Sequence, residues 1–387
     1  MDFKLNELQQ DIRDIAREYA QKCVLPRVDE IEKADAFPQD LFEQMRDMGL
    51  LGVPYPEEVG GIGAGYLATA IALEEIGKVS ASAATLLTVC YLPLDALHLY
   101  ANEEQIQKYL VPGIAGEYRG SFAFTEPDTG SDPKQLTTIA RKEGDKYIIN
   151  GCKRFISNAA YEGPIIVFAK EKETEECTAF IIEKGCKGYR LSKPYEKCSL
   201  QGSNVYDVFL DDVECTEADV LGAHGQGFDI LIGTTAYGKL AFSAVFTGTM
   251  GGSYDMAVKY AKEKTHRGKP IGAKFATIQT RIAEIAANVM AAKLCLYKAA
   301  ADADEYAGDI RKIQCSTALV KGYISDLAVA TNVLALNVHG AYGVCSEFGV
   351  ERMVRDSLVA PNIEGAADIQ RIIAGSYIIR SDKPYFD

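Results

Sequence analysis

The second half of the chain is nearly free of proline. Of the 387 residues, those beyond Pro194 include only Pro270, Pro361 and Pro384. Proline removes a backbone donor and clashes with the preceding turn, so a stretch without it can hold long helices. Apolar side chains recur here on one helical face over about five turns: Ile278, Ile282, Ile285, Val289 and Leu296.

Helical patterns recur at both ends of the chain. Those in the second half cover residues 230–264, 278–296, 309–338 and 347–356, and those in the first half cover 8–19, 38–49, 66–77, 81–100 and 102–110. Asn6 and Gln9 form the sequence pattern of a capping box at the first helix. We therefore predict an N-terminal helical domain over residues 1–118 and a C-terminal four-helix bundle over 226–387.

The middle of the chain has a different pattern, with short apolar runs between turn residues. Residues 164–169 and 178–182 are typical of buried strands, and residues 206–211 alternate between two faces. Residues 142–145 and the pair Asn150-Gly151 are typical of hairpin turns. We predict a β domain of barrel or sandwich type over residues 119–225, which makes the chain an α+β protein of three domains.

Bulk properties exclude several classes of function. The net charge of −13 argues against nucleic acid as a partner, because binding phosphates needs a basic surface. The sequence contains no run of eighteen apolar residues, so we predict no membrane span. Ten cysteines without a C-x-x-C pair suggest reduced, mostly buried thiols and a cytoplasmic protein. The four histidines have no metal-ligand spacing, so we predict no metal site.

One acidic residue stands in a setting suited to chemistry. Glu364 lies between an apolar segment, residues 358–360, and a helix-compatible run, residues 369–373, and Gly365 follows it. A carboxylate that points into an apolar pocket at such a junction has a raised pKa and can act as a base near neutral pH. The alternative is an ordinary acid at a helix N-terminus, followed by a glycine loop breaker.

Several familiar motifs are absent from the sequence, and four polar or glycine-rich corners remain. We find no G-x-G-x-x-G after a strand, no P-loop and no G-x-S-x-G elbow. The remaining corners are residues 122–132, 154–158, 264–268 and 337–343. Taken singly, they can be read as a turn, a strand end and two helix termini.

In their order and spacing, these corners resemble the acyl-CoA dehydrogenase family of flavoproteins. The family pattern T-E-P-x-x-G-S-D appears as Thr125 to Asp132, and its aromatic-I-[ST]-N strand as residues 155–158. A G-x-G-F turn appears at 225–228, V-E-R-x-x-R-D at 350–356, and E-G followed by I-Q-R at 364–371. The resemblance covers essentially the whole chain and includes the helix, strand, helix order of the domains.

The resemblance implies an FAD site and a substrate site. The FAD contacts that it implies are Phe122, Phe124, Thr125, Gly130, Ser131, Phe155, Ile156, Ser157, Ala366 and Asp368, with Lys264, His266, Arg267, Asn337, Gly340 and Ala341 supplied by a neighbouring subunit. Glu364 matches the base that removes the α-proton of an acyl-CoA thioester, while the flavin takes the β-hydride. Gly365 and Ser131 match substrate contacts. The implied partners are an electron-transferring flavoprotein and, in a homotetramer, three copies of the chain.

The sequence departs from its relatives at positions that bear on the substrate. Ile363 replaces a tyrosine, Ala366 a threonine, Lys239 an arginine of the CoA-contacting helix, and Asn337 a glutamine, and residues 264–267 replace an Arg-x-x-Phe. Lysine keeps the charge of arginine but loses its bidentate hydrogen bonding. The residues at the expected acyl pocket are unusually polar, namely Tyr91, Asp95 and Tyr237. They suggest a functionalised, branched or cyclic acyl group; the alternative is ordinary hydrogen-bonded side chains.

Several functional readings remain open from the sequence alone. The enzyme can oxidise an acyl-CoA to its 2-enoyl-CoA, or run in reverse as an enoyl-CoA reductase. The acyl group can instead be carried by an acyl carrier protein, which would suit the weaker match at Lys239. A flavin-free scaffold that keeps only the fold is a further alternative, although Glu364 and the intact segment 125–132 argue against it.

Overall fold

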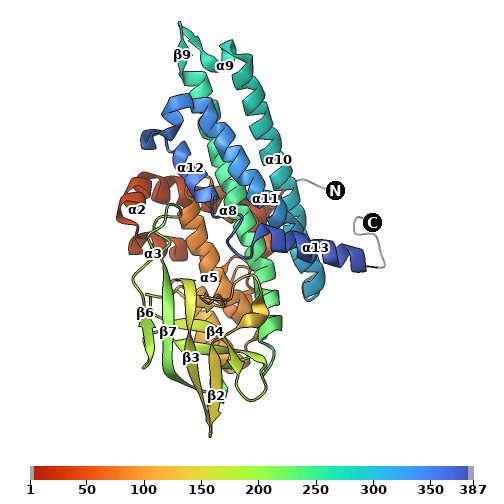
Figure 1. Ribbon diagram of the computed structural model, residues 1–387. Helices are drawn as coiled ribbons and strands as arrows, with labels where there is room; N and C mark the ends of the chain where they lie inside the picture. Colours follow the sequence, from red (N-terminus) through yellow and green to blue (C-terminus); the bar gives the residue numbers. More distant parts are fainter. Residues whose placement is uncertain (1–3, 382–387) are drawn as a thin grey trace.

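The computed structural model describes residues 4–381, and its elements fall into a helical, a β and a second helical part (Figure 1). The first part consists of α1 (Glu7–Glu18), α2 (Val28–Ala34), α3 (Gln39–Asp47), α4 (Gly65–Gly77), α5 (Ala81–Tyr100), α6 (Glu103–Gln105) and α7 (Val111–Ile114). The predicted capping box is confirmed: Asn6 Oδ1 accepts from the backbone N–H of Gln9 at 2.8 Å, and Gln9 Oε1 accepts from that of Asn6 at 3.0 Å. The residues of α5 from Ala81 to Leu97 are buried on all faces of the helix, because it packs between α4, α8 and β1.

The middle part is one mixed sheet with its own apolar core. Its strands are β1 (Ser121–Ala123), β2 (Ile139–Glu143), β3 (Lys146–Ser157), β4 (Pro164–Glu171), β5 (Cys177–Glu183), β6 (Tyr189–Leu191), β7 (Val205–Thr216) and β8 (Val220–Leu221). They are ordered β6-β7-β3-β2-β4-β5-β8, with β1 pairing parallel to β4. The hairpin turn predicted at 142–145 joins β2 to β3, where Glu143 pairs with Lys146.

The hairpin predicted at Asn150-Gly151 is wrong. Both residues lie inside β3, where the pairing with β7 shifts register between Ile149 and Gly151. A Cβ on Gly151 would lie 2.3 Å from Thr138 Oγ1, so the glycine permits a close approach of neighbouring segments. Glycine within a strand is typical of such a bulge.

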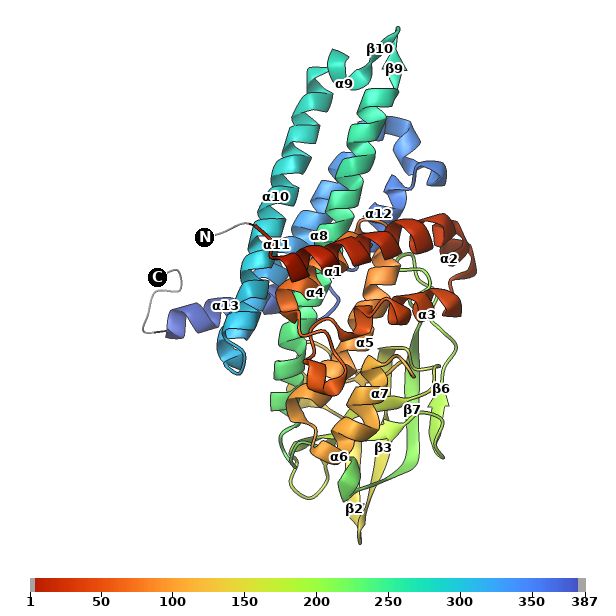
Figure 2. The same cartoon turned by 180° about the vertical axis from the view of Figure 1, so that it is seen from behind.

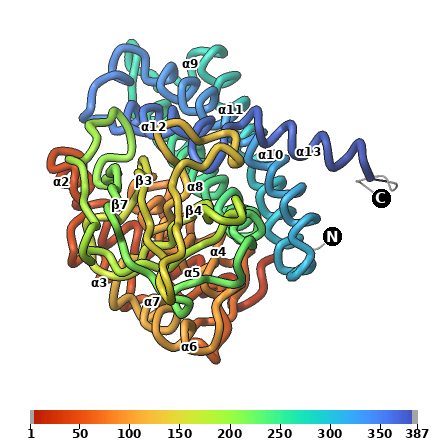
Figure 3. Tube along the Cα trace, turned by 60° about the horizontal axis from the view of Figure 1, so that its bottom comes forward, coloured from red at the N-terminus to blue at the C-terminus, as the bar shows by residue number. Residues whose placement is uncertain are grey.

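The C-terminal part contains three long helices and several shorter elements. They are α8 (Gly227–Glu263), β9 (Thr265–His266), β10 (Lys269–Pro270), α9 (Ile271–Lys274), α10 (Ala276–Glu305), α11 (Ile310–His339), α12 (Val350–Ser357) and α13 (Ala367–Arg380). Figure 2 shows α8, α10 and α11 side by side, with the N-terminal helices against the β-proximal half of α8. Figure 3 shows α13 projecting away from the rest of the chain. We keep the predicted domain limits as a proposal.

Some of the helices are apolar enough to resemble membrane spans. Three helices, at Ala81–Tyr100, Gly227–Glu263 and Ile310–Val344, are long and apolar enough to cross a membrane by length and composition. The most apolar windows of the first two are 89% and 83% buried inside the protein, and that of the third is 50% buried. Most of this apolar surface therefore packs in the protein's own core. A search of the sequence for eighteen consecutive apolar residues does not find these helices.

Candidate active site

Glu364 lies in the turn between α12 and α13, and a lysine of α11 holds that turn. The Nζ of Lys321 donates to the carbonyls of Ala360 at 2.7 Å and Gly365 at 3.4 Å, and to Ser325 Oγ at 3.0 Å. Glu364 has a φ of 53° and Gly365 one of 85°. The left-handed region is costly for a non-glycine residue, so the clamp by Lys321 keeps Glu364 in a conformation that the chain would otherwise avoid.

The carboxylate of Glu364 points at α8. Its Oε1 is buried without a hydrogen-bond partner in the described part of the chain. It lies over Gly238, where a Cβ would meet Oε1 at 2.3 Å. Burial raises the pKa of Glu364 to about 7, although the nearby cations Lys239 and Lys321 oppose that rise. A carboxyl group whose Oε1 is buried and unpartnered, and whose pKa lies near neutrality, is suited to accept a proton.

The absence of a side chain at residue 238 leaves room for the carboxylate of Glu364. In Gly238→Ala, the new Cβ would overlap both Glu364 Oε1 and Leu92 Cδ2, which lies 2.7 Å from its position. A shift of about 1 Å in a reacting group can cost about 10²-fold in rate, so we expect kcat/KM to fall by at least about tenfold. Gly251→Ala on the same helix is the control, because its nearest neighbour is the flexible Lys78 side chain at 3.3 Å. Equal kcat/KM in the two variants would contradict the prediction.

Lys239 follows Gly238 on α8 and is buried at 3% exposure. Burial lowers its pKa to about 8, and the charge of Glu364 opposes that change. The sequence predicted a substrate contact at this position. The structure places the lysine beside the candidate base, so the two groups influence each other's charge.

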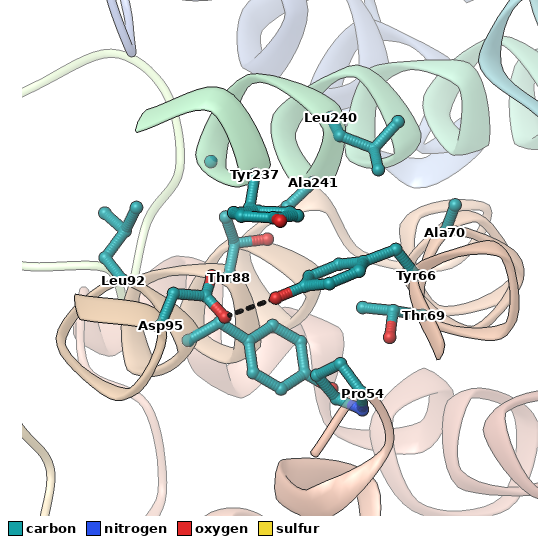
Figure 4. A pocket seen from close by; sticks show the side chains of 12 residues that line it. Pro54, Tyr66, Thr69, Ala70, Thr88, Leu92, Asp95, Tyr237, Leu240 and Ala241 are labelled. Carbon is teal, nitrogen blue, oxygen red and sulfur yellow. Dashed lines mark hydrogen bonds between the residues drawn. The ribbon is translucent and has the colours of Figure 1, made fainter. Parts of the chain in front are cut away.

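The three polar residues predicted for the acyl pocket lie together. Tyr91 and Asp95 come from α5 and Tyr237 from α8, and all three line a pocket that Gly238 also borders (Figure 4). Asp95 Oδ1 accepts hydrogen bonds from the hydroxyls of Tyr55 at 2.9 Å and Tyr66 at 3.2 Å. Burial raises the pKa of Asp95 to about 7, while the tyrosine hydroxyls lower it.

The first group of predicted flavin residues lies on and after β1. Phe122 and Phe124 are half-buried and pack against Phe168, with ring centroids 5.0 and 5.6 Å away. On β3, Phe155 is 55% exposed with a φ of 59°, whereas Ile156 is buried in the core of the sheet. Phe155 can therefore offer a ring to a ligand, while Ile156 can offer only its backbone. Thr125 and Ser157 are half-buried nearby.

The loop after Thr125 fits a phosphate-bearing group. Glu126 anchors the loop, because its carboxylate accepts from Lys153 Nζ at 2.7 Å and from the backbone N–H of Thr137 at 2.6 Å. Beyond this anchor Gly130 and Ser131 are exposed, and their N–H groups have no acceptor among residues 4–381. Free N–H groups in a polar loop are what a diphosphate needs. These residues therefore fit FAD.

The second group of predicted flavin residues lies at the opposite end of the long helices (Figure 1). Lys264, His266 and Arg267 are in and around β9. Asn337 lies in the last turn of α11, and Gly340 and Ala341 follow that helix. The two segments meet there, because Lys264 Nζ lies 4.5 Å from the ring centroid of Tyr342. The structure thus brings the second group together, but apart from the first.

The two predicted residues at the start of α13 belong to the turn that holds Glu364. Ala366 is the N-cap residue of α13, and Asp368 is exposed in its first turn. Asp368 accepts from Arg371 at 2.7 Å. A Cβ on Gly365 would lie 2.3 Å from Gln370 Nε2, so a side chain there would disturb the turn.

Sequence reasoning missed Lys321, Tyr55 and Tyr66. Lys321 interrupts the apolar run Ala318-Leu319-Val320, and a lone lysine there is a signal of a buried, partnered cation. Tyr66 begins the helix predicted at 66–77, and Tyr55 lies outside the predicted helices. No local pattern identifies their contact with Asp95.

Comparison with known proteins agrees with this geometry. The models of the acyl-CoA dehydrogenase N-terminal, middle and C-terminal domains match residues 6–117, 121–213 and 225–378. The chain is 33% identical over 385 residues to the probable acyl-CoA dehydrogenase YngJ of Bacillus subtilis, covering 98% of this chain and 100% of the relative. It is 33% identical to the caffeyl-CoA reductase-Etf complex subunit CarC of Acetobacterium woodii, covering 97% and 99%.

A solved structure gives the same result for the fold. Butyryl-CoA dehydrogenase from Megasphaera elsdenii superimposes with a TM-score of 0.93 at 30% identity, over 98% of this chain and 100% of the other. The fold predicted from the sequence, two helical parts around a β part, is confirmed. The chain belongs to the acyl-CoA dehydrogenase family, and it is an FAD-dependent oxidoreductase that acts on CH–CH bonds.

Proposed function

We propose that Glu364 removes the α-proton of an acyl-CoA thioester in this enzyme, which forms the 2-enoyl product. The observation that carries the proposal is the buried, unpartnered Oε1 of Glu364 beside the pocket lined by Tyr237 and Gly238. Burial already raises the pKa of this carboxyl to about 7, so part of the driving force for accepting a carbon-bound proton is built into the site. FAD, when bound, supplies the acceptor for the β-hydride.

The backbone of the same turn can stabilise the developing enolate. A thioester α-C–H is a weak acid, so catalysis has to stabilise charge on the carbonyl oxygen. The N–H of Glu364 has no acceptor within residues 4–381 and is available as a donor. Lys321 holds the turn from below through the carbonyls of Ala360 and Gly365. The base and the oxyanion donor are therefore positioned by one clamp.

We propose that FAD is held by two copies of the chain in a homotetramer built as a dimer of dimers. The two groups of predicted flavin residues lie at opposite ends of the long helices, so one copy does not bring them to one cofactor. Large apolar side chains are also exposed on α10, α11 and α13, namely Met290, Leu294, Tyr323, Val333, Ile372 and Ile379. Exposed apolar side chains that gather on neighbouring helices mark interaction surfaces. Light scattering tests the assembly, and a fully active monomer would contradict it.

The physiological partner and direction are also part of the proposal. CarC is named as a subunit of a complex with Etf, and it is named a reductase. We infer that this chain exchanges electrons with an electron-transferring flavoprotein and that CoA carries the acyl group. Dehydrogenation or its reverse then depends on the flavin potential and the partner. The ten cysteines are all free, four of them buried and two exposed, which is consistent with a cytoplasmic location.

The purified protein tests the activity directly. We expect it to be yellow, to carry FAD and to be bleached anaerobically by a saturated acyl-CoA but not by the free acid. A panel of straight, branched and functionalised acyl-CoA thioesters then identifies the preferred class. Colourless protein that cannot be loaded with FAD would overturn the assignment in favour of a scaffold.

The pH dependence should have opposite signs in the two directions of the reaction. Because Glu364 has a pKa raised to about 7, its proton-accepting form grows as pH rises through 7. The kcat/KM for oxidation, which reports the free enzyme, is expected to rise through about pH 7. The kcat/KM for reduction of the enoyl-CoA needs protonated Glu364 and is expected to fall over the same interval. Rising profiles in both directions would contradict this role.

A further inference from the structure

Asp95 is a buried acid without a basic partner. The side chain belongs to α5 and is 3% exposed. No lysine, arginine or histidine in the described part of the chain forms an ion pair with it. The charged group that affects its pKa is Glu364, another acid, which opposes its ionisation. Burying an unpaired carboxylate is costly, so an incoming group that compensates the charge would be favoured.

The hydrogen bonds of Asp95 leave one of its oxygens for a ligand. Oδ1 accepts from Tyr55 at 2.9 Å and from Tyr66 at 3.2 Å. Both donors are hydroxyls, which stabilise the ionised form without neutralising it. Oδ2 accepts no hydrogen bond from residues 4–381, and Asp95 lines the pocket. Figure 4 shows Asp95 beside the hydroxyl of Tyr66, joined to it by a dashed line, with the ring of Tyr237 above.

Four tyrosines lie around Asp95. Tyr66, Tyr91 and Tyr237 line the pocket, and Tyr55 lies behind Asp95. Tyr66 and Tyr237 stack with ring centroids 4.1 Å apart, and Tyr55 meets Tyr91 edge-on at 6.2 Å. Aromatic rings together with a carboxylate form the kind of environment that binds ammonium cations in proteins. A neutral hydroxyl could also donate to Oδ2, but it would leave the charge of Asp95 uncompensated.

We infer that the acyl group of the substrate carries an ammonium cation at the end remote from the thioester, held by Asp95 among these tyrosines. This inference rests on the proposed function, because it places the α-carbon of the substrate at Glu364. Asp95 and Tyr237 line the pocket, and so does Gly238, whose Cβ position lies 2.3 Å from Glu364 Oε1. The base acts at one end of the acyl group, and the cation is bound at the other.

Paired substrates of equal shape test the inference in the wild-type holoenzyme. One pair is 4-(trimethylammonio)butanoyl-CoA and 5,5-dimethylhexanoyl-CoA, and the other is 5-aminopentanoyl-CoA and hexanoyl-CoA. In each pair a positively charged nitrogen is replaced by carbon. At pH 8, above the pKa of about 7 of Asp95, we expect kcat/KM to favour the cationic member of at least one pair by about tenfold or more. Preference for the neutral member in both pairs would overturn the inference.

Asp95→Asn tests whether this acid is the source of the preference. Asparagine keeps the shape and a carbonyl oxygen for the two hydroxyls but removes the charge, so the ratio of the two kcat/KM values should fall toward one. Asp229→Asn, an exposed acid of α8, is the matched control and should retain the wild-type ratio. An unchanged ratio in Asp95→Asn would overturn the inference. If no thioester of either charge bleaches the flavin, the proposed function fails, and the inference fails with it.

Discussion

Glu364→Gln is expected to lower kcat by roughly 10²–10⁴ while FAD remains bound, because a positioned general base contributes about that factor. Glutamine is nearly isosteric and cannot accept the α-proton. It also removes the negative charge that Lys239 and Lys321 experience in the buried site. Rapid mixing of the variant with its acyl-CoA under anaerobic conditions measures flavin bleaching directly, so slow product release does not mask the effect.

The control for this change is Glu104→Gln, which removes an equal charge from an exposed residue of α6. We expect its kcat to match that of the unchanged enzyme. Flavin content and thermal midpoint of both variants separate a catalytic loss from misfolding. Turnover of Glu364→Gln near the original rate, with flavin retained, would show that another group takes the proton.

The elements that could be predicted from the sequence are those set by local patterns. The helix predicted at 81–100 is found at Ala81–Tyr100, because Ser80 caps its start and apolar residues fill it throughout. Asn150-Gly151 was misread because the same dipeptide serves a turn or a bulge. The choice depends on Thr138, which approaches Gly151 from another segment.

In the candidate site, too, the residues in local motifs could be predicted and the long-range contacts could not. Glu364 and the loop after Thr125 are contiguous motifs, so the sequence displays them. Asp95 was noticed for its polarity, but its hydroxyl donor Tyr55 is 40 residues away and their contact depends on how α5 packs. The clamp by Lys321 joins side chain and carbonyl across 39 residues. Long-range contacts of this kind leave no periodic signal in a single sequence.

A substitution in the ion pair that anchors the loop after Thr125 should have a large effect on stability. Lys153 and Glu126 form an ion pair 2.7 Å long, and both side chains are completely buried. Burial opposes ionisation of Glu126, but Lys153 and the threonine hydrogen bonds lower its pKa to about 2. Lys153→Met removes the cation and leaves the acid buried. Breaking a buried pair in this way costs about 3–5 kcal/mol of stability.

We therefore expect the Lys153→Met variant to unfold at markedly lower urea concentration and to lose FAD more readily, because Glu126 anchors the loop that presents Gly130 and Ser131. Adding Glu126→Gln should restore part of the lost stability, since no uncompensated charge then remains. Lys146→Met on the same strand, which breaks an exposed pair with Glu214, is the control and should cost at most about 1 kcal/mol.

The pH dependence of the folding stability tests the Lys153–Glu126 pair independently. A carboxyl whose pKa is lowered in the folded state, as for Glu126, contributes stability above its unfolded pKa that is lost as pH falls toward 2. The wild type should therefore lose more stability than the Lys153→Met, Glu126→Gln double variant between about pH 5 and pH 2. Equal losses would mean that the pair does not stabilise the loop, and the FAD-binding role of residues 125–132 would need another anchor.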